Sequence, residues 1–130
     1  MSITEHALRN LVAGDLVDAV DGGVRAVHNP ATGKVIAEVP EGTQADVDRA
    51  VAAAKAASPG WRDTPPGERA HAMLKLADLL EEHGEELCRL ESANVGKPMA
   101  VAREEMPITV DNVRFFASAG PIFQMAIISG

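Results

Sequence analysis

The chain has 130 residues, of which 46% are apolar and 24% charged, a composition that is typical of a globular protein and excludes a disordered or fibrous one. Its net charge of −7 argues against nucleic acid or an anionic membrane as the main partner, because both need a basic face. One cysteine excludes an internal disulfide, and the N-terminus lacks the pattern of a signal peptide, so the cytoplasm is the expected location.

Two antiparallel hairpins are predicted before residue 41. Residues 8–20 hold two short apolar segments on either side of the turn-forming pair Gly14-Asp15. Val24–His28 and Lys34–Val39 form a second pair of strand candidates, separated by the turn Asn29–Gly33. The final glycine of that turn can take a positive φ. All these connections are too short for a parallel crossover, so the strands should pair antiparallel.

From residue 43 the spacing of apolar residues becomes helical. Thr43, with Asp46 three residues later, resembles a capping box in which Asp replaces the usual Glu. The helix should end near Ser58–Gly60, and Trp61 should fill the junction with the next helix. The apolar positions predicted for the face of this first helix are Val47, Ala50, Val51 and Ala54.

A second helical segment is predicted from Thr64, which should be its N-cap, with Pro65 at the first helical position. Gly84 should interrupt or kink this segment, and Gly96 should end its continuation. Its predicted buried stripe consists of Met73, Leu76, Ala77 and Leu80, widened by Leu74 and Leu79.

Pro98 opens a further predicted helix that reaches Ala117, and Pro107 should kink or split it. Beyond Arg114 the sequence carries no charge, and the pair Gly120-Pro121 should break the apolar end. A natural domain rarely leaves such an apolar terminus exposed.

No stretch of the sequence holds a complete catalytic constellation. Cys88 is the only thiol, and its acidic neighbours oppose an activated thiolate, so we interpret it as an inert helical residue. His71 and His83 are too far apart for a metal-ligand pair on one motif and are interpreted as helix-surface residues. The chain contains no G-x-G-x-x-G, and Gly33-Lys34 lacks the remainder of a phosphate-binding loop. Chemistry alone therefore assigns no activity.

Short motifs follow one another in a specific order along residues 10–119. They are Asn29–Gly33, Val39–Gly42, Asp46–Val51, Trp61 before Thr64-Pro65-Pro66, Leu76–Glu81, Gly96–Pro98 and Arg114–Ala117. In that order and spacing they resemble the N-terminal segment of the NAD(P)-dependent aldehyde dehydrogenases. Residues 95–105 look most like the aminoaldehyde and betaine-aldehyde branch of that superfamily.

The resemblance implies oxidation of a small-molecule aldehyde to a carboxylic acid, with NAD or NADP as cofactor, in an enzyme that is typically a homo-oligomer. In the family, the catalytic cysteine and glutamate and the cofactor-binding strands lie downstream of this segment. We therefore assign no catalytic and no cofactor-binding residue, and Cys88 does not match the catalytic motif. By position, Glu105 matches the acidic ligand of a structural monovalent cation, with a backbone carbonyl near Val27–His28 as a second ligand.

The expected fold class is α/β, and α+β within this segment: N-terminal β-hairpins plus amphipathic helices that form part of a cofactor-binding domain. Residues 1–119 are predicted to be an incomplete N-terminal part of that domain, and residues 120–130 a divergent apolar tail. The chain alone should neither bind the cofactor nor be active. A non-enzymatic helical binding or regulatory module stays open as an alternative, because the helices carry their own caps.

Overall fold

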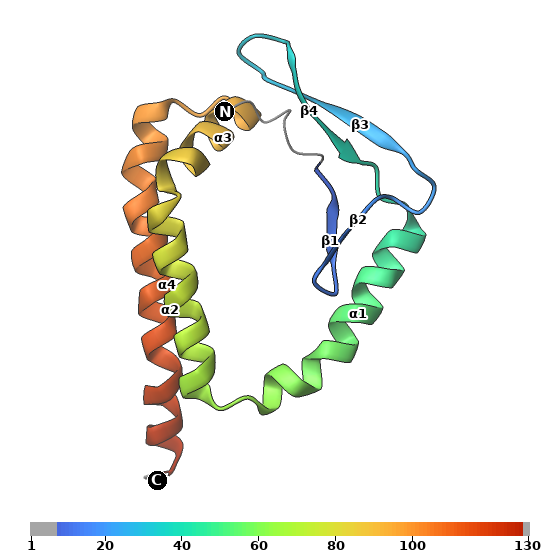
Figure 1. The fold of residues 1–130 in the computed structure, drawn as a ribbon. Helices are drawn as coiled ribbons and strands as arrows, with labels where there is room; N and C mark the ends of the chain where they lie inside the picture. The colour runs from blue at the N-terminus through green and yellow to red at the C-terminus, as the bar shows by residue number, and fades with distance from the viewer. Residues whose placement is uncertain (1–7, 129–130) are drawn as a thin grey trace. The chain divides into compact units, whose positions relative to one another are not determined.

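The computed structural model describes residues 8–128, and the side chains of residues 8–119. Within that range it contains two separate two-stranded antiparallel sheets followed by helices, so the expected mixed α/β class is confirmed (Figure 1). The chain divides into two compact units. The first holds the chain up to Arg62 together with Ala93–Gly96, and the second holds Asp63–Ser92 and the chain from Lys97 onward.

The first hairpin pairs β1 (Asn10–Val12) with β2 (Asp15–Val17). Its turn is Ala13-Gly14, with φ values of 55° and 90°, and not Gly14-Asp15 as predicted. Two-residue hairpin turns of this type need a positive φ at both central positions, and Gly14 meets that need at the second one. The strand therefore begins one residue earlier than the sequence suggested.

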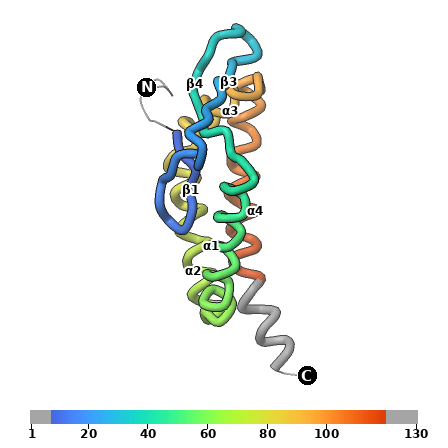
Figure 2. Tube along the Cα trace, turned by 90° about the vertical axis from the view of Figure 1, so that its right-hand side faces the viewer, coloured from blue at the N-terminus to red at the C-terminus, as the bar shows by residue number. Residues whose placement is uncertain are grey.

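The second hairpin pairs β3 (Val24–His28) with β4 (Val35–Pro40), which run side by side in Figures 1 and 2. Its turn closes through the Asn29 carbonyl, which accepts a hydrogen bond from the Gly33 N–H at 2.8 Å. The Asn29 side chain also accepts one from the Ala31 N–H at 2.9 Å. Gly33 has a φ of 68°, which confirms the predicted turn.

Asp46 joins the end of the first hairpin to α1 (Gln44–Asp63). One carboxylate oxygen accepts hydrogen bonds from the N–H and the hydroxyl of Thr43, both at 2.9 Å, and the other accepts from the Val20 N–H at 2.9 Å. These bonds, that of the Thr43 N–H first, lower the pKa of Asp46. The predicted capping contact to Thr43 is confirmed, whereas the bond from Val20 had no signal in the sequence.

The prediction that α1 ends near Ser58–Gly60 is wrong, because the helix continues through Pro59 to Asp63. A proline inside a helix removes one backbone hydrogen bond, and the alanine-rich turns before it favour continuation. Trp61 lies in the last turn of α1 and not in the connection after it, where the sequence placed it. The predicted face of α1 is also uncovered, since Val47 and Val51 are both exposed.

The second unit is built on α2 (Pro66–Glu82) and α4 (Met99–Ile128), which run alongside each other (Figure 1). On α2 the covered residues are Met73, Ala77 and Leu80, whereas Leu74, Leu76 and Leu79 are exposed. The predicted stripe is thus half right. The buried residues of α4 recur at helical spacing and are Ala102, Val110 and Ala117.

Helix α2 begins one residue later than predicted, with Pro65 as N-cap and Pro66 inside the first turn. The cap residue is therefore Pro65 and not Thr64, because the second proline can also occupy a position whose N–H needs no partner. Gly84 ends the segment as predicted and starts α3 (Gly84–Val95). A Cβ at Gly84 would lie 3.1 Å from Cγ of Met106, so the glycine allows α4 to approach.

Helix α4 begins after Pro98, as predicted, and the Ala102 N–H donates to the Pro98 carbonyl at 3.1 Å. The helix runs to Ile128 without interruption, so Pro107 does not split it and Gly120-Pro121 does not break it. In the described part of the chain, no helix combines the length and apolarity needed to cross a membrane.

Candidate functional site

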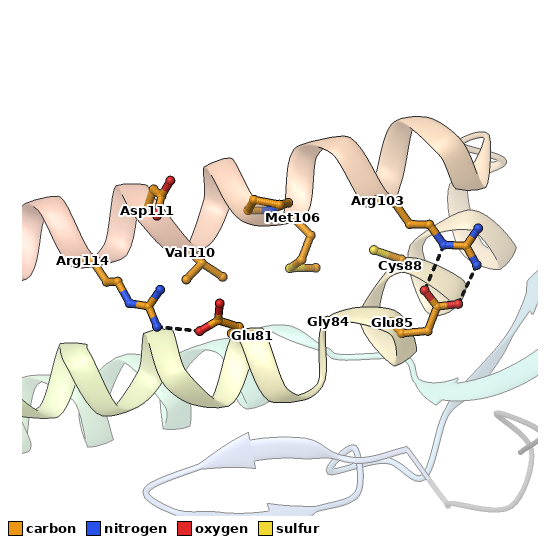
Figure 3. A pocket seen from close by; sticks show the side chains of 10 residues that line it. Glu81, Gly84, Glu85, Cys88, Arg103, Met106, Val110, Asp111 and Arg114 are labelled. Carbon is orange, nitrogen blue, oxygen red and sulfur yellow. Dashed lines mark hydrogen bonds and ion pairs between the residues drawn. The ribbon is translucent and has the colours of Figure 1, made fainter.

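A groove lies between α2, α3 and α4 in the second unit (Figure 3). Its volume is about 280 Å³, near the lower limit for pockets that take a drug-sized ligand. Apolar side chains line its middle, and ion pairs lie at its two ends. The lining residues are Glu81, Gly84, Glu85, Cys88, Arg103, Met106, Pro107, Val110, Asp111 and Arg114.

Glu85 and Arg103 form a two-pronged ion pair at one end of the groove, as Figure 3 shows. Arg103 donates from Nε to one carboxylate oxygen at 2.9 Å and from Nη2 to the other at 2.7 Å. Arg89, one turn along α3, lies 3.0 Å from the same carboxylate. The hydrogen bond from Arg103, with the charges of both arginines, lowers the pKa of Glu85 from 4.5 to about 2. Glu85 in turn raises the pKa of Arg103.

Arg114 lies at the other end of the groove and links α4 to the last turns of α2. Its Nη2 donates to Glu81 at 2.7 Å and to Asp78 at 3.0 Å, and these two bonds raise the pKa of Arg114. All three side chains are partly exposed, so these bonds add little to stability. Both arginines of the groove are thus bonded to carboxylates of the same groove.

Cys88 lies on the floor of the groove and is only 1% exposed. A nucleophilic thiol needs a general base and access to its substrate. The lining residues include no histidine, and the carboxylate of Glu85 is held by arginines. The geometry therefore describes a thiol packed as a small apolar group, which agrees with the interpretation from the sequence.

Lys97 bridges α3 and α4 near their connection. Its Nζ donates to the carboxylates of Glu91 and Glu105, both at 2.5 Å. The Lys97 side chain is 25% exposed, and the carboxylates of Glu105 and Glu91, in that order, raise its pKa. The ammonium thus neutralises part of the charge of a carboxylate pair.

The cation site at Glu105 stays a prediction. Its expected second ligand, a carbonyl near Val27–His28, belongs to the first unit, whereas Glu105 belongs to the second. Among residues 8–128 no group of three or more His, Cys, Asp or Glu side chains could hold a metal ion. His71 is exposed on α2, as predicted, whereas His83 is exposed in the turn between α2 and α3 and lies 3.6 Å from Glu86.

We expect the Glu85–Arg103 pair to stabilise the folded chain less as the pH falls. The folded-state pKa of Glu85 is depressed, so its contribution is present above pH 4.5 and lost as the pH falls through about 2. Thermal midpoints measured across this window should fall less steeply in Glu85→Gln than in the unchanged chain. Glu104→Gln, which removes an exposed carboxylate of α4, is the matched control. Parallel curves for the unchanged chain and Glu85→Gln would contradict the assignment.

The sequence profile described as "Aldehyde dehydrogenase family" matches residues 17–129, which is most of the chain. The chain belongs to the aldehyde dehydrogenase family. This confirms the superfamily that the ordered motifs predicted. The finer assignment to an aminoaldehyde or betaine-aldehyde branch is not confirmed, and the division at residue 119 also stays a prediction.

This aldehyde dehydrogenase segment is 42% identical over 119 residues to malonate-semialdehyde dehydrogenase 1 from Geobacillus thermodenitrificans, covering 92% of this chain and 25% of that relative. It is 48% identical over 89 residues to phenylacetaldehyde dehydrogenase from Pseudomonas fluorescens, covering 67% of this chain and 18% of that relative. The chain therefore spans about a quarter or less of the length of these curated relatives.

The solved NAD⁺ complex of an aldehyde dehydrogenase from Bacillus cereus has the same fold over this segment. Its TM-score is 0.85 at 39% sequence identity, covering 89% of this chain and 24% of that one. Both the sequence and the fold thus place the segment in the family, and NAD⁺ is the cofactor of that Bacillus cereus structure.

The ion pairs are the features that sequence reasoning missed. Arg103 and Glu85 are 18 positions apart, and Arg114 and Glu81 are 33 positions apart. No spacing rule links such positions, because their contact depends on how α4 lies against α2 and α3. The only sequence feature that pointed to these residues is the pair of acids in the first turn of α3. Acidic side chains there stabilise the N-terminus of a helix through its dipole.

Proposed function

We propose that these residues belong to an NAD(P)-dependent aldehyde dehydrogenase that oxidises an aldehyde to a carboxylic acid. The observation that carries the proposal is the family match over residues 17–129. The identity of 42% to a malonate-semialdehyde dehydrogenase supports the reaction class, and the NAD⁺ complex of the Bacillus cereus relative supports the cofactor class. The nicotinamide would accept the hydride that leaves the substrate.

Within that enzyme, we assign the residues of this chain a structural role and no catalytic one. The sequence lacks a glycine-rich dinucleotide loop, and Arg103 and Arg114 are already bonded to carboxylates. These residues therefore do not fit a phosphate-binding role. What they do is hold α2, α3 and α4 in one alignment, which is the contribution of a supporting layer to a larger domain.

A chimera tests this role. Residues 10–119 replace the corresponding segment of the Geobacillus malonate-semialdehyde dehydrogenase, and NADH production with that enzyme's aldehyde is followed spectrophotometrically. Because 42% identity preserves the packing pattern, we expect kcat/KM within about tenfold of the parent enzyme, equivalent to about 1.4 kcal/mol of lost transition-state stabilisation. The parent enzyme lacking this segment is the control and should be inactive.

Two outcomes would contradict the proposal. The first is a chimera with the parent's circular dichroism and NAD⁺ affinity but without activity. The second is NADH production by residues 1–130 alone, which would mean that this chain carries catalytic groups of its own. A non-enzymatic helical binding module, the alternative function, predicts that the chimera does not fold into an active enzyme.

A further inference from the structure

The Lys97–Glu91–Glu105 cluster carries an inference that does not depend on enzymatic activity. Glu91 lies on α3, Glu105 lies on α4, and Lys97 comes from the connection between these two helices. Each carboxylate has an oxygen 2.5 Å from Nζ, so these two oxygens are no more than about 5 Å apart. Two carboxylates at that separation repel each other unless a cation lies between them.

The position of Nζ is also where a metal ion would bind. Carboxylate oxygens are ligands of hard cations, and Nζ lies between one oxygen of Glu91 and one of Glu105. An ammonium and a metal ion therefore compete for one position. The ammonium is attached to the chain, so covalent geometry holds it at this position and no ion has to be taken up from solution.

We propose that the Lys97 ammonium is the built-in cation of the Glu91–Glu105 pair and takes the position that a monovalent metal ion would otherwise occupy at Glu105. It acts as a positioning residue that holds the start of α4 against α3. The described chain then needs no Na⁺ or K⁺ at this cluster. Removing the ammonium should create a cation site where none is needed now.

The test compares thermal midpoints of the full chain in NaCl, KCl and choline chloride at equal ionic strength. The unchanged chain should have the same midpoint in all three salts. Lys97→Met keeps the length of the side chain and removes its charge, and should lower the midpoint in choline chloride by about 3 °C. Part of that loss should return in NaCl or KCl, because a metal ion then fills the position, and sodium-23 NMR should detect the bound ion.

Lys75→Met is the matched control, because Lys75 is exposed on α2 and its loss should give no ion-specific response. Adding Glu105→Gln to Lys97→Met should remove the response to sodium and potassium. Lys97→Arg retains the charge and should behave as the unchanged chain does, which keeps the test informative if Lys97→Met does not fold.

Two results would overturn the inference. One is an unchanged chain that is stabilised by NaCl or KCl relative to choline chloride and loses this effect on Glu105→Gln, because Glu105 would then bind a metal ion beside Lys97. The other is a Lys97→Met variant that folds and matches Lys75→Met in all three salts, since the two carboxylates would then form no cation position.

Discussion

Replacing Ala77 by Asp is expected to lower the free energy of unfolding by about 3–5 kcal/mol, the cost of leaving a charge buried without a partner. Ala77 is 0% exposed and lies on the face of α2 that packs along α4. Arg114 of α4 bonds to Asp78, the residue after Ala77, and to Glu81, so its guanidinium already has partners. The new carboxylate would therefore find neither water nor a free cation.

The measurement is chemical denaturation of the full chain, followed by circular dichroism. Ala72→Asp is the matched control, because it places the same residue on the exposed side of the same helix. It should cost only about 0.5 kcal/mol, the difference in helix propensity. The interpretation of the α2–α4 contact would be wrong if Ala77→Asp and Ala72→Asp destabilised the chain equally.

Ala77→Asp also tests whether packing between α2 and α4 is needed for the proposed enzyme to fold. In the Geobacillus chimera, Ala77→Asp should abolish soluble, active enzyme, whereas Ala72→Asp should leave NADH production unchanged. A supporting layer acts on catalysis only through the alignment of the elements it holds, so its core substitutions should reduce the amount of folded enzyme rather than the activity of the folded fraction. Activity per folded molecule separates these two effects.

Helical periodicity predicted that α2 and α4 exist but not which of their apolar faces is covered. Ala77 and Leu76 are neighbours in one predicted stripe, yet the first is fully buried and the second is 49% exposed. The helical spacing of apolar residues shows which side chains share a face. Whether that face is buried depends on the other elements that pack against it. The core of the described residues is accordingly made of small side chains, and Cys88 is its largest fully buried one.

The proline just before α4 was predicted correctly, whereas the prolines inside α1 and α4 were not. Pro98 and Gly96 were placed correctly, because a helix end has local chemistry that the sequence records. Pro59 was expected to end its helix and Pro107 to kink or split its own, and both helices continue through them. An interior proline removes one backbone hydrogen bond and crowds the preceding turn at a cost of about 3 kcal/mol, so the flanking turns must offset that cost in both helices.

The candidate site was the part least accessible to prediction. Family membership could be inferred because motifs such as Asn29–Gly33 and Gly96–Pro98 encode turns whose geometry is local. The Glu85–Arg103 and Glu81–Arg114 pairs depend on tertiary packing, and the sequence shows them only as charges on helix faces. The same holds for Lys97, whose two partners lie on different helices.

Gly96→Ala is expected to destabilise the first unit by about 3 kcal/mol through two separate causes. Gly96 has a φ of 77°, a left-handed conformation that costs a residue with a Cβ roughly 1–2 kcal/mol. In addition, that Cβ would lie 3.0 Å from Cγ of Pro30, and overpacking of this kind costs about 1–3 kcal/mol. The proline ring is rigid, so it cannot rotate away as a flexible side chain would.

Gly33→Ala separates the two causes, since Gly33 has a φ of 68° but nothing within 4 Å of its Cβ position. It should cost only the conformational part, roughly 1–2 kcal/mol. Combining Gly96→Ala with Pro30→Ala should return the steric part, and the double-mutant cycle gives its size from denaturation curves. Equal costs for Gly96→Ala and Gly33→Ala, with no coupling to Pro30→Ala, would mean that the chain at Gly96 does not contact the β3–β4 turn in solution. A coupling above about 1 kcal/mol would instead place the end of α3 firmly against that turn, through a contact between segments more than sixty residues apart in the sequence.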